Sequence, residues 1–171
     1  MSSAATILVR TAREGDQAAL IDLDAAAWSP ESGFPSVIQA ADHPAVTFFT
    51  VADPPGAHLV AELDEAVVGY VRLKPPTHLP ENAHITHVSG LAVHPAARRR
   101  GVAAALMTAA EPYARARGAR KLSLRVLSTN QPAMRLYERL GFEREGVMKE
   151  EFLIGGRYVD DVLMAKRLWA Y

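Results

Sequence analysis

The sequence predicts a single α/β domain built on one mixed sheet. The chain has 171 residues, 49% of them hydrophobic, which is enough for one globular domain with a continuous core. Some segments have apolar residues at every second position, as in strands, and others have them at helical spacing. The two kinds of segment follow one another along the chain. The order is strand and helix, then a meander, then strand, helix, strand, helix and a closing hairpin. We expect one domain over residues 1–171, with its core over about 6–167.

The N-terminal half contains the least regular part of the chain. Residues 7–10 (ILVR) predict a short strand, and the apolar spacing of 11–27 predicts a helix. Five prolines and two glycines in 29–56 indicate short helical pieces and loops. The apolar runs 58–63 and 66–73, separated by two acidic residues, predict an antiparallel hairpin.

The C-terminal half is more regular. Residues 84–93 predict a strand whose interior Gly90 indicates a bulge or a close backbone approach. The spacing of 99–117 predicts a helix that Pro112 should kink or loosen. The remaining expected elements are a strand at 121–127, a helix from Asn130 to Gly141, and a hairpin over 150–165 that turns at Gly155-Gly156.

The charges are segregated although their sum is zero. Residues 94–125 hold eight basic residues against Glu111, and residues 10–65 hold ten acidic residues against two arginines. A neutral total argues against a nucleic-acid coat protein. The segregation suits a small polyanion at one site with a cationic substrate nearby, and solvated helix faces would explain it equally well.

Several classes of site and location are not expected. The chain has no cysteine, no histidine pair at i, i+4 spacing, and in His84 and His87 too few ligands for a metal, so we expect no metal site. Residues 1–5 lack the features of a secretory signal, and no apolar run approaches the ~20 residues that span a bilayer. We expect a cytoplasmic protein with no membrane partner.

The junction LAVHPAARRRGVAAAL, residues 91–106, is the most informative stretch. It lacks the Gly-Lys-Ser/Thr of a Walker loop, the glycines of a dinucleotide motif, and the aromatic residues of a nucleic-acid platform. A strand that leads directly into a helix leaves the first-turn N–H groups unpaired at the positive end of the helix dipole, which favours phosphate. Gly101 and Ala103 would let an anion approach the backbone closely. A plain turn with exposed arginines is the alternative.

Two motifs resemble the GNAT superfamily of N-acetyltransferases. Residues 98–103 (RRRGVA) match its Arg/Gln-x-x-Gly-x-Gly/Ala signature, and residues 130–143 (NQPAMRLYERLGFE) resemble its Asn-x-x-Ala…Tyr…Gly-Phe segment. The resemblance covers 84–165 closely and 6–73 in element order. It implies a twisted, mostly antiparallel sheet of about six or seven strands, flanked by about four helices, with splayed central strands. It also implies acetyl-CoA as the co-substrate of a direct transfer to an amine.

The resemblance implies roles for named residues in binding the co-substrate. The backbone of Leu91, Ala92 and Val93 would pair with the pantetheine arm like an added strand. Asn130 would contact the pantetheine, cap the following helix, or both. The ribose phosphate would meet Arg98, Arg120 or Lys121, a choice that the resemblance leaves open. The backbone amides expected to hold the diphosphate belong to Arg99, Arg100, Gly101, Val102, Ala103 and Ala104.

The expected catalytic residues are Tyr137 and His87. Tyr137 matches the tyrosine that protonates the departing thiolate, and it also lies on an apolar helix stripe, so a core position is the alternative. Many relatives carry a glutamate on the fourth strand, and 84–93 has none. His87 is the candidate base, sharing strand parity with Ser89, Leu91 and Val93, while a water relay or capture of neutral amine remains open.

The acceptor is expected to be a small primary amine, with an amino acid first and polyamines, aminoglycosides and protein N-termini after it. The acidic segment and Glu150-Glu151 suit an ammonium group, and Arg72 and Lys74 suit a carboxylate. Two other functions stay open: a catalytically silent acyl-CoA-binding sensor and a protein N-terminal acetyltransferase. A nucleic-acid partner is not expected, and the sequence leaves the oligomeric state open, a homodimer included.

Overall fold

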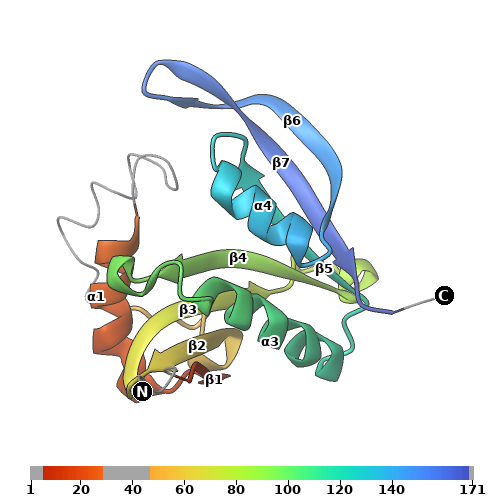
Figure 1. Ribbon diagram of the computed structural model, residues 1–171. Coiled ribbons are helices and arrows are strands. Elements are labelled where there is room, and N and C mark those ends of the chain that lie inside the picture. The colour runs from red at the N-terminus through yellow and green to blue at the C-terminus, as the bar shows by residue number, and fades with distance from the viewer. Residues whose placement is uncertain (1–5, 29–46, 170–171) are drawn as a thin grey trace.

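A twisted sheet of seven strands forms the centre of the protein (Figure 1). The computed structural model describes residues 6–28 and 47–169. The strand order is β1-β2-β3-β4-β5-β7-β6, in which β4 and β5 are parallel and the other neighbours are antiparallel. The strands are β1 (Leu8–Thr11), β2 (His58–Leu63), β3 (Ala66–Lys74), β4 (Ile85–Val93), β5 (Lys121–Leu127), β6 (Glu143–Ile154) and β7 (Arg157–Arg167).

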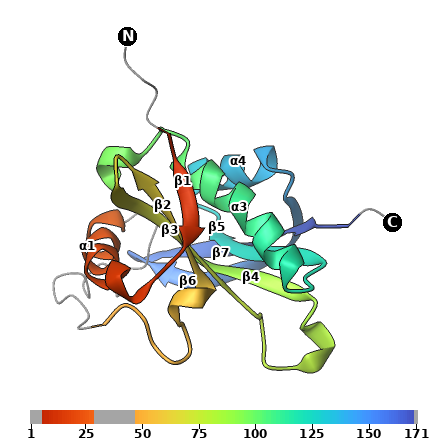
Figure 2. The ribbon, with the colours of Figure 1, turned by 90° about the horizontal axis from the view of Figure 1, so that it is seen from below.

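The helices cover both faces of the sheet. In the described residues these are α1 (Gln17–Ala27), α3 (Val102–Ala116) and α4 (Gln131–Arg139). Figure 2 shows α1 on one side of the sheet and α3 and α4 on the other. The residues of β2 alternate between the two sides, since Leu59 and Ala61 belong to the core under α3 and Val60 belongs to the core under α1. Strand β2 is therefore apolar on both faces, as burial between helices requires.

The mixed, mostly antiparallel sheet expected from the sequence is confirmed, as is the hairpin of the runs 58–63 and 66–73. The hairpin expected over 150–165 is also confirmed, and its strands extend over 143–167. Gly155 and Gly156 both take positive φ, 55° and 76°, as a tight hairpin turn requires. The short helical pieces and loops expected over 29–56 lie mostly outside the described residues. Helix α3 continues through Pro112 to Ala116.

Helices α1 and α3 both begin later in the chain than the spacing of apolar residues predicts. The segment before α1 is a 3-10 turn, Glu14–Asp16, because the Asp16 carboxylate accepts the Arg13 amide at 2.7 Å and the Arg10 guanidinium at 2.8 Å. Helix α3 begins at Val102 because Arg99 and Gly101 take positive φ, 61° and 85°. The spacing of apolar residues along the sequence gives no signal for such a turn.

Candidate active site

The two parallel strands at the centre of the sheet part halfway along their length. Strands β4 and β5 are in register from the pair Ile85 and Lys121 to the pair Val88 and Leu124. Strand β4 then continues to Val93 without pairing to β5, while its other edge stays paired to β3. The splayed central strands that the family resemblance implies are confirmed. The gap leaves one edge of β4 open to a ligand.

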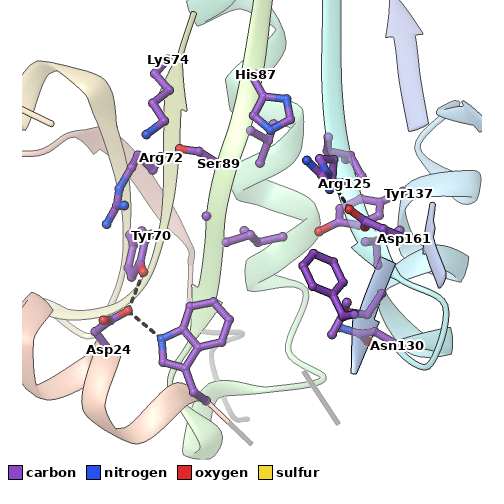
Figure 3. Close-up of a pocket in the computed structure, with 18 of the residues that line it drawn as sticks. Asp24, Tyr70, Arg72, Lys74, His87, Ser89, Arg125, Asn130, Tyr137 and Asp161 are labelled. Atoms are coloured by element: carbon purple, nitrogen blue, oxygen red, sulfur yellow. Dashed lines mark hydrogen bonds and ion pairs between the residues drawn. The ribbon is translucent and has the colours of Figure 1, made fainter. Parts of the chain in front are cut away.

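A cavity of about 790 Å³ lies where the strands part (Figure 3). Helices α1 and α4 and strands β3 to β7 all contribute side chains to its lining. Three cationic residues line it, Arg72, Lys74 and Arg125, and three acidic ones, Asp24, Glu151 and Asp161. The other lining residues that bear polar side chains are Tyr70, His87, Ser89, Trp28, Asn130 and Tyr137.

A bulge in β4 sets which side chains reach this cavity. Between β3 and β4 the pairing shifts from Arg72 opposite Gly90 to Leu73 opposite Val88, so Ser89 is the extra residue. Val88 packs in the core under α3, and Ala92 packs in the core under α1. In a regular strand, two residues four positions apart would lie on the same face.

The parity expected for His87 with Leu91 and Val93 is therefore wrong, whereas Ser89 lines the cavity together with His87. Leu91 and Val93 pack against the α3 core, and His87 shares the cavity face of Lys74, its register partner. The extra residue reverses the alternation, which a count along the sequence cannot detect. The interior Gly90 did indicate a bulge, and the bulge lies beside it.

His87 is held as a neutral imidazole at the point where the strands part. Its Nδ1 lies 3.0 Å from Ser123 Oγ on β5. Burial lowers the pKa of His87 below its ordinary 6.5, Arg125 and Lys74 lower it further, and Asp161 opposes them. In the tautomer with the proton on Nδ1, the ring donates to Ser123 and the Nε2 lone pair can accept a proton.

Tyr137 is a core residue and also a cavity residue. Its ring is 7% exposed, packs in the α3 core and lies 5.8 Å from the Phe142 ring, centroid to centroid. Its hydroxyl has no hydrogen bond to any residue that the structure describes. Burial raises the pKa of Tyr137 to about 12, so the hydroxyl keeps its proton at neutral pH. The core position posed by the sequence is confirmed, and the role of Tyr137 as proton donor stays a prediction.

Asn130 caps α4 and lines the same cavity. Its Oδ1 accepts the amide of Ala133 at 3.2 Å, which confirms the expected helix cap. The side chain lies on the same side of the opening as Tyr137 (Figure 3).

The junction between β4 and α3 presents a run of backbone amides. The first bond of the helix ladder is donated by Ala105 to the Gly101 carbonyl, at 2.9 Å. In the described part of the chain the amides of residues 99–104 make no hydrogen bond, as expected at a helix start. The Arg98 guanidinium donates to the carbonyls of Val93 and Ala27, so this side chain ties the junction to the end of α1. Of the residues expected to bind acetyl-CoA, Leu91 and Asn130 line the cavity.

The sequence did not indicate several cavity residues. Asp24 Oδ1 accepts hydrogen bonds from Trp28 Nε1, at 3.0 Å, and from Tyr70 OH, at 2.5 Å. Asp161 on β7 is 3% exposed and pairs with Arg125. The available signals were the helical spacing of Asp24 and Trp28 and an acidic residue inside the apolar run of β7.

Two further properties concern the described ranges 6–28 and 47–169. No group of three or more histidine or acidic residues there is placed to hold a metal ion. No helix in these ranges is long and apolar enough to cross a membrane.

Comparison with known proteins identifies the family. The acetyltransferase (GNAT) family matches residues 18–142. The L-amino acid N-acetyltransferase AaaT of Escherichia coli K12 is 35% identical over 121 residues, covering 68% of this chain and 72% of that protein. A GCN5-related N-acetyltransferase from Kribbella flavida superposes with a TM-score of 0.70 at 26% identity, over 94% of this chain and 97% of that one.

A second solved structure shares the fold and contains acetyl-CoA. It is yncA of Salmonella typhimurium, described as a putative acetyltransferase with its cofactor acetyl-CoA, with a TM-score of 0.76 at 18% identity over 98% of this chain and 96% of that one. The splayed strands, the two motifs and these matches agree with one another. The chain belongs to the GNAT family and is an N-acetyltransferase.

Proposed function

We propose that the enzyme transfers the acetyl group of acetyl-CoA to the primary amine of an amino acid or a similar small molecule. The observation that carries the proposal is that Arg72 and Lys74 line the cavity beside His87 (Figure 3). Two cations suit a carboxylate, and the acids that line the same cavity suit an ammonium group. An amino acid has both charges. The L-amino acid N-acetyltransferase similar to this chain supports the same acceptor.

The residues present fit acetyl-CoA. Gly101, at φ 85°, turns the backbone so that the unbonded amides of residues 99–104 open the helix, and these amides would hold the diphosphate. Leu91, Ala92 and Val93 belong to the part of β4 that has no partner on the β5 side, where their backbone would hold the pantetheine arm. Acetyl-CoA supplies a thioester, which an amine can attack without further activation of the acyl carbon.

His87 and Tyr137 would move the two protons of the transfer. An alkylammonium with a pKa near 10 must lose a proton before it attacks, and His87 Nε2 would accept this proton directly or through water. The amine nitrogen forms its bond to the acyl carbon, and the carbon–sulfur bond breaks. The neutral hydroxyl of Tyr137 would protonate the departing thiolate. An amide of β4 would stabilise the negative charge that develops on the acyl oxygen.

The test is an acceptor panel with purified protein, acetyl-CoA and a reagent for the released thiol. The panel contains amino acids, their carboxamides, polyamines, aminoglycosides and short peptides. We expect turnover on amino acids above all others. Turnover confined to peptides would point to protein N-termini, and tight acetyl-CoA binding by calorimetry without any turnover would point to a sensor; either result would overturn the proposal.

A further inference from the structure

A fully buried histidine lies behind Arg72, one of the three cationic residues that line the cavity. His58 on β2 and Arg72 on β3 are register partners, and Arg72 Nε lies 3.0 Å from His58 Nε2. His58 Nδ1 lies 2.9 Å from the carbonyl oxygen of Pro54. A carbonyl accepts hydrogen bonds and cannot donate, so Nδ1 has the proton and Nε2 has the lone pair. Both bonds therefore require a neutral ring in a single tautomer.

The surroundings keep this ring neutral. His58 is 0% exposed and lies among aromatic rings, with centroids 5.3 Å away for Phe48, 5.3 Å for Phe49 and 6.2 Å for Tyr70. Burial lowers the pKa of His58, and Arg72 and Lys74 lower it further. The Pro54 carbonyl and Asp53 act in the opposite direction.

The hydrogen-bond partner that orients Arg72 is thus a neutral ring and not a carboxylate. Among the described residues, the acid nearest to Arg72 and Lys74 is Asp53, which forms ion pairs with Arg72 Nη1 at 4.0 Å and with Lys74 Nζ at 3.6 Å, both longer than a hydrogen bond. Arg10, by contrast, donates to Asp16 at 2.8 Å and to Glu62, and Arg125 is paired with Asp161. A carboxylate partner would fix an arginine and cancel its charge, whereas a neutral imidazole fixes it and leaves the charge available.

We propose that His58 is a positioning residue that holds Arg72 ready to bind the carboxylate of the acceptor, and so selects amino acids over amines that lack this group. The Phe48 ring, 5.7 Å from the Arg72 guanidinium carbon, supports the same orientation from a second side. His58 itself does not line the cavity, so it acts through Arg72. The inference rests on the proposed amino-acid acceptor.

Two substitutions of similar size separate this role from a general role in folding. Gln in His58→Gln can place an oxygen near the Nε2 position and accept from Arg72, whereas the shorter Asn in His58→Asn reaches only toward Pro54. The probes are the amino acid with the highest turnover in the panel and its carboxamide, each compared with its own wild-type value. The variants are checked by melting temperature and by acetyl-CoA calorimetry.

We expect His58→Asn to lower kcat/KM for the amino acid about tenfold, chiefly through KM, because a hydrogen bond to a charged group is lost. Its kcat/KM for the carboxamide should stay within about twofold, and His58→Gln should restore most of the loss. An equal loss on both acceptors would overturn the proposal. Absence of turnover on every amino acid by the wild type would instead refute the proposed function, so the two failures differ.

The pH dependence of KM gives a second readout, which needs only the wild type and His58→Gln. Protonation of His58 puts a hydrogen on Nε2, which then cannot accept from Arg72. For the wild type, KM for the amino acid should rise relative to KM for the carboxamide as the pH falls below 6.5. In His58→Gln this ratio should stay constant over the same range, and a ratio that changes equally in both proteins would contradict the assignment.

Discussion

His87 Nδ1 lies 3.0 Å from Ser123 Oγ, across the parallel strands β4 and β5 and one residue before the two strands part. This contact fixes the imidazole at the start of the opening, in the cavity that Lys74 and Arg125 also line. Burial lowers the pKa of His87 and the same two cations lower it further, so the proposed base is already neutral at physiological pH.

The first prediction concerns the acidic limb of the pH profile. A base must be unprotonated to act, and the pKa of His87 is below 6.5, so its contribution should be constant at higher pH and decline as the pH falls through that pKa. We expect His87→Gln to lower kcat/KM about 10²-fold at pH 7.5. The ratio of wild-type to variant kcat/KM, measured from pH 5 to 8, cancels titration of the acceptor and should fall at the acidic end.

Ser123→Ala is the matched control for this prediction. It removes the bond to Nδ1 and leaves the imidazole, so the acidic limb should persist with a smaller loss of rate. A wild-type to His87→Gln ratio that stays flat across the pH range would leave a water relay or capture of neutral amine as the route for the proton.

The second prediction concerns the Tyr137 hydroxyl. Its ring supports the core through contact with Phe142, and its hydroxyl makes no hydrogen bond to the described residues. Tyr137→Phe should lower kcat about 10²-fold, leave acetyl-CoA affinity within about twofold, and leave the melting temperature unchanged. Tyr137→Ala should lower the melting temperature as well, because a buried ring is lost. Full activity of the Phe variant would restrict Tyr137 to packing.

The third prediction concerns the amides that open α3. Gly101 has φ 85°, which side-chain-bearing residues rarely adopt, and a carboxylate there would face the expected diphosphate. Gly101→Glu should weaken acetyl-CoA binding at least tenfold by calorimetry, whereas Gly101→Asn, which tolerates positive φ, should weaken it much less. Equal, unchanged affinity in both variants would remove the diphosphate from this junction.

The fourth prediction concerns the close packing of α3 on β3. A Cβ on Gly69 would lie 2.9 Å from Val102 Cγ1 and 3.1 Å from Leu106 Cδ1 and from the Ala92 oxygen. Gly69→Ala should lower the free energy of unfolding by about 1–3 kcal/mol, measured by denaturant titration. Gly15→Ala meets nothing within 4 Å and should change it by less than about 0.5 kcal/mol. Comparable values for the two variants would contradict the close approach.

Local patterns determined most of the secondary structure and the family. The alternation in residues 121–127 predicts β5 at its observed bounds, and the glycine pair predicts the turn between β6 and β7. The motifs at residues 98–103 and 130–143 identified the acetyltransferase family. They also indicated Gly101, Asn130 and Tyr137 as candidate site residues. Such signals survive in the sequence because they depend on residues that are neighbours along the chain.

Tertiary structure decided which residues line the cavity and on which face of the sheet each side chain of β4 lies. One extra residue at Ser89 reverses the alternation after His87, and whether a strand has a bulge depends on the strand that pairs with it. The positions that complete the site, Asp24 and Asp161, come from α1 and β7, more than 130 residues apart in the chain. His58 acquires its neutral tautomer from Pro54 and Arg72 together. The sequence by itself thus determined the fold class and the family, and burial and cross-strand contacts, which a linear pattern does not contain, decided which side chains line the cavity.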